Sequence, residues 1–157
     1  MISIRRAKTD DISGVNKLLR QVLMVHHNIR ADIFKPDVKK YTDEQLKDIF
    51  CDENKPVFVA TDESQNIVGY VFCIIKQHIG NNIFTDIKTL YIDDLCVDEE
   101  KRGMHTGKKL YEYALDYARN IGCYNVTLNV WSGNDTAVRF YEKCGMTPQK
   151  IEMEKIL

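Results

Sequence analysis

The chain has 157 residues, a length typical of one globular domain, so we expect a single domain over residues 1–157. The net charge of −1 disfavours a broad nucleic-acid-binding surface, and no apolar run approaches the roughly 18 residues that a membrane span needs. The first residues turn polar at once and the five cysteines form no CxxC pair, so we expect a cytoplasmic protein with mostly buried, reduced thiols.

The first third of the chain reads as one strand and two helices. Alternating isoleucines predict a strand over residues 2–7, and apolar residues at helical spacing predict a helix from residue 9 to about 25. Residues 25–41 have no clean period and are expected to be irregular. The sequence of residues 42–45 is a capping box, which predicts the start of a short second helix.

The middle of the chain is rich in β-forming residues. Residues 56–63 and 66–77 predict an antiparallel hairpin, and residues 78–86 are expected to form an excursion before the next strand. A further strand over residues 90–97 leads into a glycine-containing basic loop, residues 102–108, that opens a long helix.

The last third alternates between helix and strand. The long helix is expected to end at Gly122, followed by a strand over residues 124–131 in which Trp131 is expected to be a core residue. A short helix follows from Asn134 to Gly145, and residues 147–157 predict one or two terminal strands. The element order indicates a mixed α+β domain around one sheet.

The strand, loop and helix over residues 90–121 are typical of an anion-binding site. A helix N-terminus has free backbone N–H groups and partial positive charge, and glycine permits close approach of a ligand. Lysine and arginine side chains add full charges at the same place: Lys101, Arg102, Lys108 and Lys109. A nucleotide-binding P-loop fits poorly, because that motif needs four residues between its glycines and Ser or Thr after its lysine.

Four segments resemble the Gcn5-related N-acetyltransferase (GNAT) superfamily: LYIDDLCV, EEKRGMHTGKKL, NVTLNVW and NDTAVRFYEKCGM. In the loop, Arg102 and Gly107 match the family pattern, but His105 stands where a glycine is usual. The downstream family pattern is met in full by Asn134, Ala137, Phe140, Tyr141 and Gly145.

The resemblance implies a layered α/β/α fold of the α+β class. Its single mixed, mostly antiparallel sheet would have six to seven strands, with helices on both faces. It also implies acetyl-CoA as the acetyl donor. The histidines show no metal-ligand spacing, so we expect no metal. The residues implied to bind acetyl-CoA are Leu95, Cys96, Val97, Arg102, Gly103, Met104, His105, Thr106, Gly107, Lys108, Asn134 and Tyr141.

The resemblance further implies direct transfer in a ternary complex, with Tyr141 protonating the leaving thiolate and an acidic residue acting as base. We assign the base to Asp93. Because strand residues alternate between faces, we expect Asp93 and Asp94 on opposite faces of the sheet. Core packing for Tyr141 and a solvated strand end for the two aspartates are the structural alternatives.

The acceptor is expected to be a primary amine, and we predict a small cationic amine or polyamine. YIDDLCV is similar to the corresponding strand of polyamine acetyltransferases, and the expected acceptor contacts are Asp93, Asp94, His26 and Phe34. Two alternatives stay open, which are a protein or peptide amino-group acetyltransferase and a non-catalytic CoA-binding module. Relatives often pair through their C-terminal strands, so we also predict a homodimer.

Overall fold

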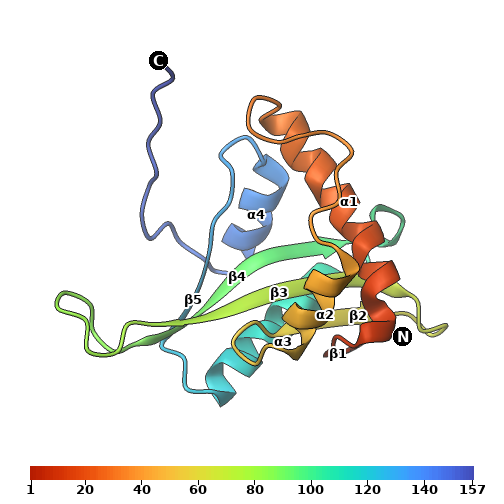
Figure 1. The fold of residues 1–157 in the computed structure, drawn as a ribbon, viewed down its shortest axis with the longest axis horizontal. Coiled ribbons are helices and arrows are strands. Elements are labelled where there is room, and N and C mark those ends of the chain that lie inside the picture. The colour runs from red at the N-terminus through yellow and green to blue at the C-terminus, as the bar shows by residue number, and fades with distance from the viewer.

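One five-stranded sheet organises the computed structural model, which describes residues 1–157 (Figure 1). The strands lie in sequence order: β1 (Ser3–Arg6), β2 (Val57–Thr61), β3 (Ile67–Gln77), β4 (Lys88–Val97) and β5 (Asn125–Leu128). The first four pair antiparallel and β5 pairs parallel with β4. The predicted mixed, mostly antiparallel sheet is confirmed, whereas the predicted count of six to seven strands is wrong.

The missing strands are those predicted over residues 147–157. This segment leaves α4 and extends away from the body of the molecule (Figure 1). None of its backbone groups forms a hydrogen bond within the chain. A strand exists only where a neighbouring strand pairs with it, and the segment pairs with no strand of its own chain, although the outer edge of β5 is free.

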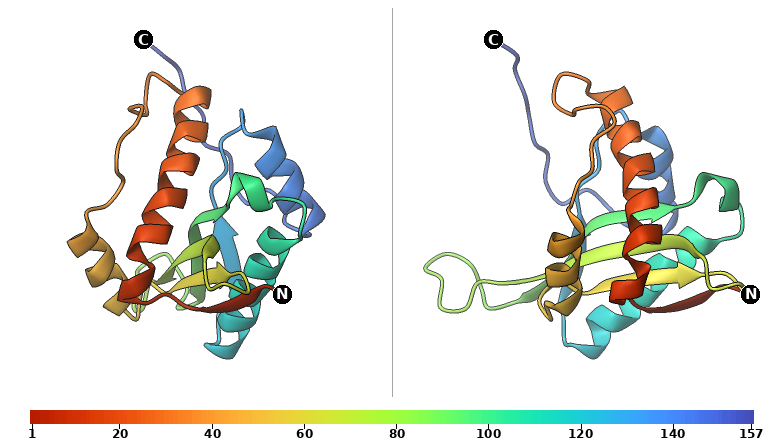
Figure 2. Two further views of the ribbon diagram at one scale, coloured as in Figure 1. Left: turned by 90° about the vertical axis from the view of Figure 1, so that its right-hand side faces the viewer. Right: turned by 45° about the vertical axis from the view of Figure 1, so that its right-hand side comes forward.

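Helices cover both faces of the sheet. Figure 2 shows α1 (Ile12–Ile29) and α2 (Asp43–Cys51) on one side, with α3 (Thr106–Asn120) and α4 (Asp135–Lys143) on the other. Short 3-10 turns precede α1 at Thr9–Asp11 and follow β4 at Glu99–Lys101. The layered α/β/α arrangement therefore agrees with the predicted fold class.

The sheet separates two hydrophobic clusters. Val15, Leu18 and Leu46 from α1 and α2 pack on one face, and Leu110 and Ala114 from α3 pack on the other. Both clusters are built by strand residues that alternate between the faces, as the period of two requires. The two-sided burial makes the sheet a rigid support for residues at its ends.

The end of α1 and the start of α2 border the α1–α2 loop. The capping box at α2 is confirmed, since Thr42 Oγ1 accepts the Gln45 N–H at 3.2 Å and Gln45 Oε1 accepts the Thr42 N–H at 2.8 Å. It fixes the chain just after the α1–α2 loop. The end of α1 lies at Ile29, beyond the predicted end near residue 25, because its last turn extends past the buried part of the helix and needs no apolar stripe.

The structure bears on two further expectations from the sequence, the absence of a membrane span and the burial of the cysteines. No helix is long and apolar enough to cross a lipid bilayer. All five cysteines are free, but Cys73 and Cys96 alone are buried and Cys51 is exposed, so the prediction of mostly buried thiols is wrong. Cys51 is the last residue of α2, where its side chain faces solvent.

Candidate active site

A β-bulge in β4 carries the two aspartates. Phe72 of β3 pairs with Asp94 and Cys73 pairs with Ile92, so Asp93 is an extra residue without a partner on β3. Such an insertion interrupts the alternation of side chains. Asp93 and Asp94 consequently both approach Lys40, and the expectation that they point to opposite faces is wrong.

Lys40 links this carboxylate pair to the α1–α2 loop. Its Nζ lies 3.7 Å from Asp93 Oδ2 and 3.9 Å from Asp94 Oδ2. The side chain of Asp93 is 31% exposed and that of Asp94 only 7%. The two carboxylates therefore share one cation but differ in contact with water.

A tyrosine of the neighbouring strand β3 fixes the carboxyl group of Asp94. Tyr70 Oη donates a hydrogen bond of 2.9 Å to Asp94 Oδ2, and the Tyr70 side chain is fully buried. Burial raises the pKa of Asp94 to about 6, although the Lys40 charge and the Tyr70 hydrogen bond act in the opposite direction. A carboxyl with this pKa exchanges protons close to neutral pH.

Tyr141 enters from α4 on the other side of β4. Its ring packs against Tyr111 and Phe140, with centroid separations of 6.3 and 5.1 Å. Burial, followed by the negative charge of Asp94, raises the pKa of Tyr141 above its usual value of 10. The phenol therefore stays protonated at neutral pH and is available as a proton donor.

His26 and Phe34, two of the predicted acceptor contacts, lie together near the C-terminal end of α1. Their ring centroids are 5.1 Å apart, and Phe34 makes an edge contact of 5.4 Å with Trp131. The Arg30 guanidinium lies 5.9 Å from the Trp131 ring centroid. Trp131 is 37% exposed, so its prediction as a core residue is wrong; it follows β5 outside the sheet and forms part of this aromatic cluster.

The basic loop after β4 presents a continuous run of unpaired N–H groups. No backbone N–H of residues 102–108 has a hydrogen-bond acceptor within the chain. The run ends in the first turn of α3, where the helix dipole adds partial positive charge. The unpaired N–H groups of this loop are therefore left for a ligand, whereas Thr106 Oγ1 is buried without a hydrogen-bond partner.

His105 has the left-handed conformation at the start of α3. Its φ of 57° and ψ of 15° show that a non-glycine residue adopts positive φ at this loop position. Gly103 has φ of 85°. Gly107 has no positive φ, and a Cβ added there would meet Val97 and Phe140 at ordinary distances of 3.5 and 3.6 Å. Positions 103 and 105 are thus the two places in this loop where the backbone has positive φ.

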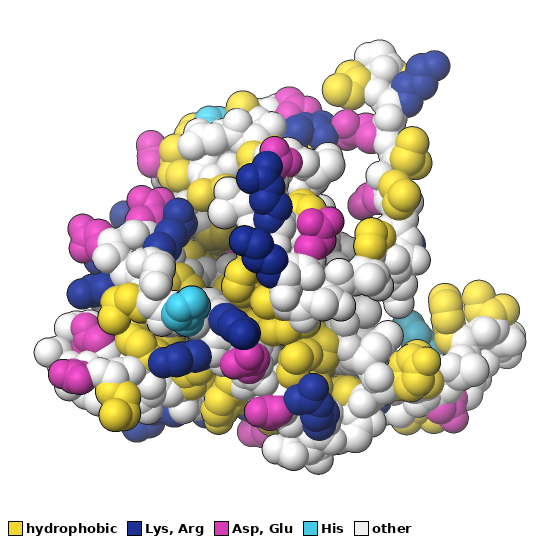
Figure 3. Space-filling view, turned by 180° about the vertical axis from the view of Figure 1, so that it is seen from behind, with side chains coloured by type: hydrophobic (Ala, Val, Ile, Leu, Met, Phe, Trp, Pro, Cys, Tyr) yellow, Lys and Arg dark blue, Asp and Glu magenta, His cyan; other side chains and the backbone are white.

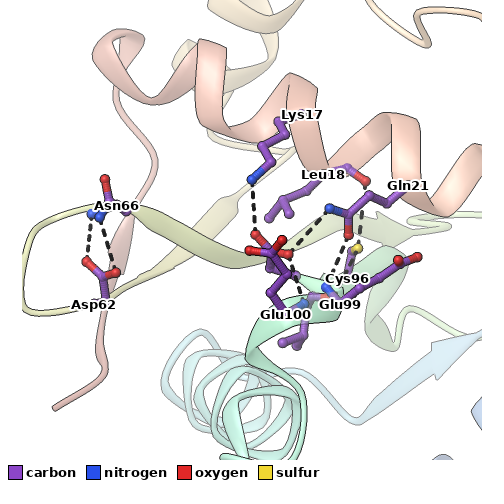
Figure 4. A network of polar contacts seen from close by, with 10 residues as sticks. Lys17, Leu18, Gln21, Asp62, Asn66, Cys96, Glu99 and Glu100 are labelled. Carbon is purple, nitrogen blue, oxygen red and sulfur yellow. Dashed lines mark hydrogen bonds and ion pairs between the residues drawn. The ribbon is translucent and has the colours of Figure 1, made fainter.

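Contacts with α1 hold the start of this loop (Figure 4). Asp98 accepts hydrogen bonds from Lys17 and Gln21, each at 3.4 Å, and from the Glu100 N–H at 3.2 Å. Gln21 Oε1 accepts the Glu99 N–H at 3.3 Å. The polar cluster fixes where β4 ends and so where the N–H run begins.

The edge of β4 that faces β5 is open over the predicted pantetheine contacts. β5 pairs with residues 89–92 only, and no backbone hydrogen bond joins residues 93–97 to the segment after β5 (Figure 1). Leu95, Cys96 and Val97 therefore border a gap between the two strands. Asn134 caps α4 by accepting the Ala137 N–H at 3.2 Å, which leaves its side-chain amide donor free.

Several polar residues around the two aspartates are not predicted from the sequence. Lys40 belongs to an aperiodic loop, and Tyr70 lies in the apolar part of a strand. Tyr91 Oη accepts a hydrogen bond of 3.2 Å from Asn129, and the Lys76 ammonium lies 3.7 Å from the Tyr91 ring centroid. No local sequence pattern identifies these residues, because they come together only in the tertiary structure.

Three comparisons bear on this geometry. The model of the "Acetyltransferase (GNAT) family" matches residues 24–146. Among solved structures, a mutant of the BH1408 protein from Bacillus halodurans has 32% identity and a TM-score of 0.94, with 99% of each chain covered. Glucosamine-6-phosphate N-acetyltransferase from Arabidopsis thaliana has 27% identity and a TM-score of 0.73, with 99% of this chain and 98% of that chain covered.

Sequence relatives differ in the acceptors that their names give. Glucosamine 6-phosphate N-acetyltransferase from Arabidopsis thaliana is 41% identical over 99 residues, which are 55% of this chain. The match spans only 64% of that relative's length. Peptidyl-lysine N-acetyltransferase YjaB from Salmonella typhimurium is 25% identical over 92% of this chain and 83% of its own length.

Proposed function

Because this chain belongs to the GNAT family of acetyltransferases, we propose that it transfers the acetyl group of acetyl-CoA to a primary amine in a ternary complex. The unpaired N–H groups of residues 102–108, next to the open edge of β4, carry this proposal. They offer an anion site and a strand-like edge side by side. A diphosphate joined to an extended amide-containing arm has the chemistry to fill both.

The residues present fit acetyl-CoA. The loop amides of residues 102–108, with Lys108 and Arg102 beside them, would hold its pyrophosphate. The free edge of Leu95, Cys96 and Val97 would pair with the pantetheine amides, and the Asn134 amide would donate to the same arm. When bound, acetyl-CoA supplies the activated acetyl thioester.

The chain's own residues would move two protons. An acceptor amine arrives as an ammonium ion, so a base has to remove a proton before the nitrogen attacks. Asp93 was the predicted base, but the burial of Asp94 and its pKa of about 6 favour Asp94, with Asp93 orienting the amine. Tyr141 Oη would donate the proton that the leaving sulfur needs, since its raised pKa keeps it protonated.

For the acceptor we propose a small cationic amine or polyamine. Asp93 is the more exposed carboxylate of the pair and is oriented by Lys40 at the bulge. The aromatic cluster of His26, Phe34 and Trp131 offers apolar surface for a carbon chain near the end of α1. An ammonium that binds Asp93 would replace Lys40 as its counter-ion.

One observation favours a second acceptor class, an amine that also carries an anionic group. Lys40 already neutralises part of the carboxylate pair, and Lys76 lies over Tyr91 on the same face. Two cations beside the carboxylates would suit an amino sugar phosphate or an amino acid. The plant relative's name gives such an acceptor, glucosamine 6-phosphate.

A CoA-release assay over a panel of amines tests these proposals. The panel holds spermidine, glucosamine 6-phosphate, free amino acids, an aminoglycoside and a lysine peptide, each with acetyl-CoA in excess. Release with spermidine supports the cationic acceptor, and release with the sugar phosphate alone supports the second class. Release with the peptide alone would mark a protein amino-group acetyltransferase. If acetyl-CoA raises the melting temperature but no amine gives release, the enzyme proposal fails in favour of a CoA-binding module.

We also propose a cellular location, an oligomeric state and a metal requirement. The protein is cytoplasmic and a homodimer, and it uses acetyl-CoA as a co-substrate without a metal. Fractionation of cells that express the tagged protein tests the location. Addition of EDTA during the CoA-release assay tests the metal-free reaction, which should lose no rate.

A further inference from the structure

Lys40 places a primary amine at the two carboxylates that are proposed to receive the acceptor. Its Nζ lies 3.7 Å from Asp93 Oδ2 and 3.9 Å from Asp94 Oδ2, and its side chain is 30% exposed. No other lysine or arginine forms an ion pair with either aspartate. The Lys40 ammonium therefore occupies the position that the proposed function gives to the ammonium of an acceptor.

The aromatic part of the proposed acceptor site is also near Lys40. Burial, followed by the positive charge of Lys40, lowers the pKa of His26 below its usual value. The His26 ring lies 5.1 Å from that of Phe34, which in turn contacts Trp131. Lys40 is thus a neighbour of both the carboxylate pair and the aromatic cluster.

The groups proposed to move protons gather around the same carboxylate. Asp94 is the proposed base, and its negative charge, after burial, contributes to the raised pKa of Tyr141, the proposed proton donor. Leu95 follows Asp94 directly in β4 and begins the open edge that would receive the pantetheine arm. A nitrogen held at Asp94 consequently lies where the acceptor side meets the donor side.

Lys40 needs only a small movement to become a nucleophile. A base has to lie within about 2.6–3.2 Å of the nitrogen that it deprotonates, so Lys40 Nζ would approach Asp94 by about 1 Å. Lysine has a flexible four-carbon stem. Residues 30–42, which join α1 to α2, contain no helix or strand. The approach therefore requires no change in the helices or the sheet.

We propose that the chain acetylates its own Lys40. The inference rests on the proposed function, because it uses the same acetyl donor, base and proton donor. Asp94 removes one proton from the Lys40 ammonium, and the nitrogen then bonds to the acetyl carbon of acetyl-CoA as the bond from that carbon to sulfur breaks. The nitrogen loses a second proton to water, while Tyr141 protonates the sulfur and regains a proton from water. The products are Nε-acetyl-lysine and the CoA thiol, with one proton released and no oxidation or reduction.

Acetylation changes the charge at the carboxylate pair. An amide is neutral, so the modified Lys40 no longer forms an ion pair with Asp93 or Asp94. A bound acceptor amine displaces Lys40 from these carboxylates, so the reaction takes place while no amine occupies the site. Enzyme that turns over an amine therefore keeps its Lys40 ammonium.

Mass spectrometry of the full chain tests the proposal. The protein is first treated with a lysine deacetylase, which is then removed, and it is incubated with acetyl-CoA and no amine. One acetyl group should appear on each chain. Chymotrypsin cleaves after Phe34 and Tyr41, and fragmentation of the peptide between them should locate the acetyl group on Lys40.

The same peptide carries its own control. Lys39 is more exposed than Lys40, at 41% against 30%, and pairs with Asp43 away from the bulge. Figure 3 shows further lysine and arginine side chains spread over the opposite face of the molecule. Uncatalysed acetylation favours exposed amines, whereas Lys40 should react at least about 100-fold faster than Lys39, because only Lys40 has a base beside it.

Three variants and a dilution complete the experiment. Lys40→Arg keeps a positive charge at the carboxylates and should take up no acetyl group. Tyr141→Phe should acetylate Lys40 roughly 100-fold more slowly than wild type, and its matched control Tyr111→Phe should react at the wild-type rate. Because amine and base belong to one chain, about tenfold dilution of the protein at saturating acetyl-CoA should leave the first-order rate constant unchanged.

A Lys40 that stays unmodified overturns the proposal. If the panel of amines gives CoA release with the same preparation, this inference alone fails, and if it gives none, the proposed function fails as well. Equal rates at Lys39 and Lys40, or an undiminished rate in Tyr141→Phe, would show uncatalysed acetylation and also overturn it. A rate constant that falls on dilution would show that another copy of the chain modifies Lys40, which contradicts self-acetylation.

Discussion

Tyr70 on β3 donates a 2.9 Å hydrogen bond from its Oη to Asp94 Oδ2 on β4, and both side chains are buried at the bulge. The phenol holds one carboxyl oxygen in a fixed position while burial raises the pKa of this group to about 6. A general base works best when its pKa lies near the working pH. The pair therefore couples a positional restraint to a proton affinity suited to neutral solution.

Asp94→Asn should stabilise the folded protein at pH 8. The folded-state pKa of Asp94 lies above its unfolded value, so the folded protein binds more protons between about pH 4 and 6 and its free energy of unfolding falls as pH rises through this interval. Removing the ionisable group should recover up to about 3 kcal/mol at pH 8 and little at pH 4. Urea unfolding at both pH values measures the difference.

Asp93→Asn is the control for this effect. Asp93 is 31% exposed, so its substitution should change the free energy of unfolding by similar, small amounts at pH 8 and pH 4. Equal pH slopes for wild type and Asp94→Asn would show that Asp94 does not titrate near pH 6. Turnover should fall strongly in Asp94→Asn if this carboxylate is the base, and KM for the amine should rise in Asp93→Asn.

Lys40→Met should move the acid limb of kcat/KM toward higher pH. The Lys40 ammonium lowers the pKa of Asp94, and without it the carboxyl takes up its proton at higher pH. The free enzyme would then need a more alkaline solution to keep the base ionised. The pH dependence of kcat/KM for CoA release, measured with one amine that saturates the enzyme, gives the shift.

Lys39→Met provides the comparison for Lys40→Met. Lys39 is the neighbouring lysine, but its ammonium pairs with Asp43 at 2.6 Å, away from the bulge. Lys39→Met should therefore leave the pH dependence of kcat/KM unchanged. A Lys40→Met profile that coincides with wild type would contradict the electrostatic coupling between Lys40 and Asp94.

Much of the fold follows from periodicity and turn chemistry. The capping box at Thr42, the β2–β3 hairpin and the strand–loop–helix unit around β4 all form where local patterns predict them. The terminal strands over residues 147–157 do not form, because the segment makes no backbone hydrogen bond to any neighbouring strand. Local sequence predicts β-forming tendency, and pairing decides whether a strand exists.

The site was harder to predict for a related reason. The departure from glycine at His105 is visible in the loop pattern, whereas the relation between Asp93 and Asp94 is not. One extra residue in β4 reverses the alternation, and no residue type marks that insertion. Lys40 joins the site from a loop without periodicity, so only the tertiary structure shows that it contacts the bulge.

Tyr141→Phe should lower kcat by roughly 100-fold or more, the usual contribution of a positioned general acid. The Phe ring keeps the packing against Tyr111 and Phe140, so the fold and the affinity for acetyl-CoA should be unchanged. Because burial raises the Tyr141 pKa, wild type should show no alkaline loss from this group below about pH 10. Stopped-flow CoA release and isothermal titration with acetyl-CoA separate the two effects.

Tyr111→Phe controls for the loss of a hydroxyl in the same aromatic cluster. Tyr111 is buried on α3 and its ring meets the Tyr141 ring at 6.3 Å. Its variant should retain wild-type turnover. Unchanged kcat in Tyr141→Phe across the pH range would remove Tyr141 from the proton-donor role.

His105→Val should weaken acetyl-CoA binding by roughly 10-fold, whereas His105→Gly should bind at least as tightly as wild type. The backbone at position 105 has φ of 57°, which costs a β-branched residue about 1–3 kcal/mol and glycine nothing. Valine would therefore shift the loop and misalign the N–H groups of residues 102–108. Titration calorimetry with acetyl-CoA compares the three proteins. If His105→Gly instead binds about 10-fold more weakly, the imidazole itself contacts the pyrophosphate, and the backbone alone does not account for the anion site.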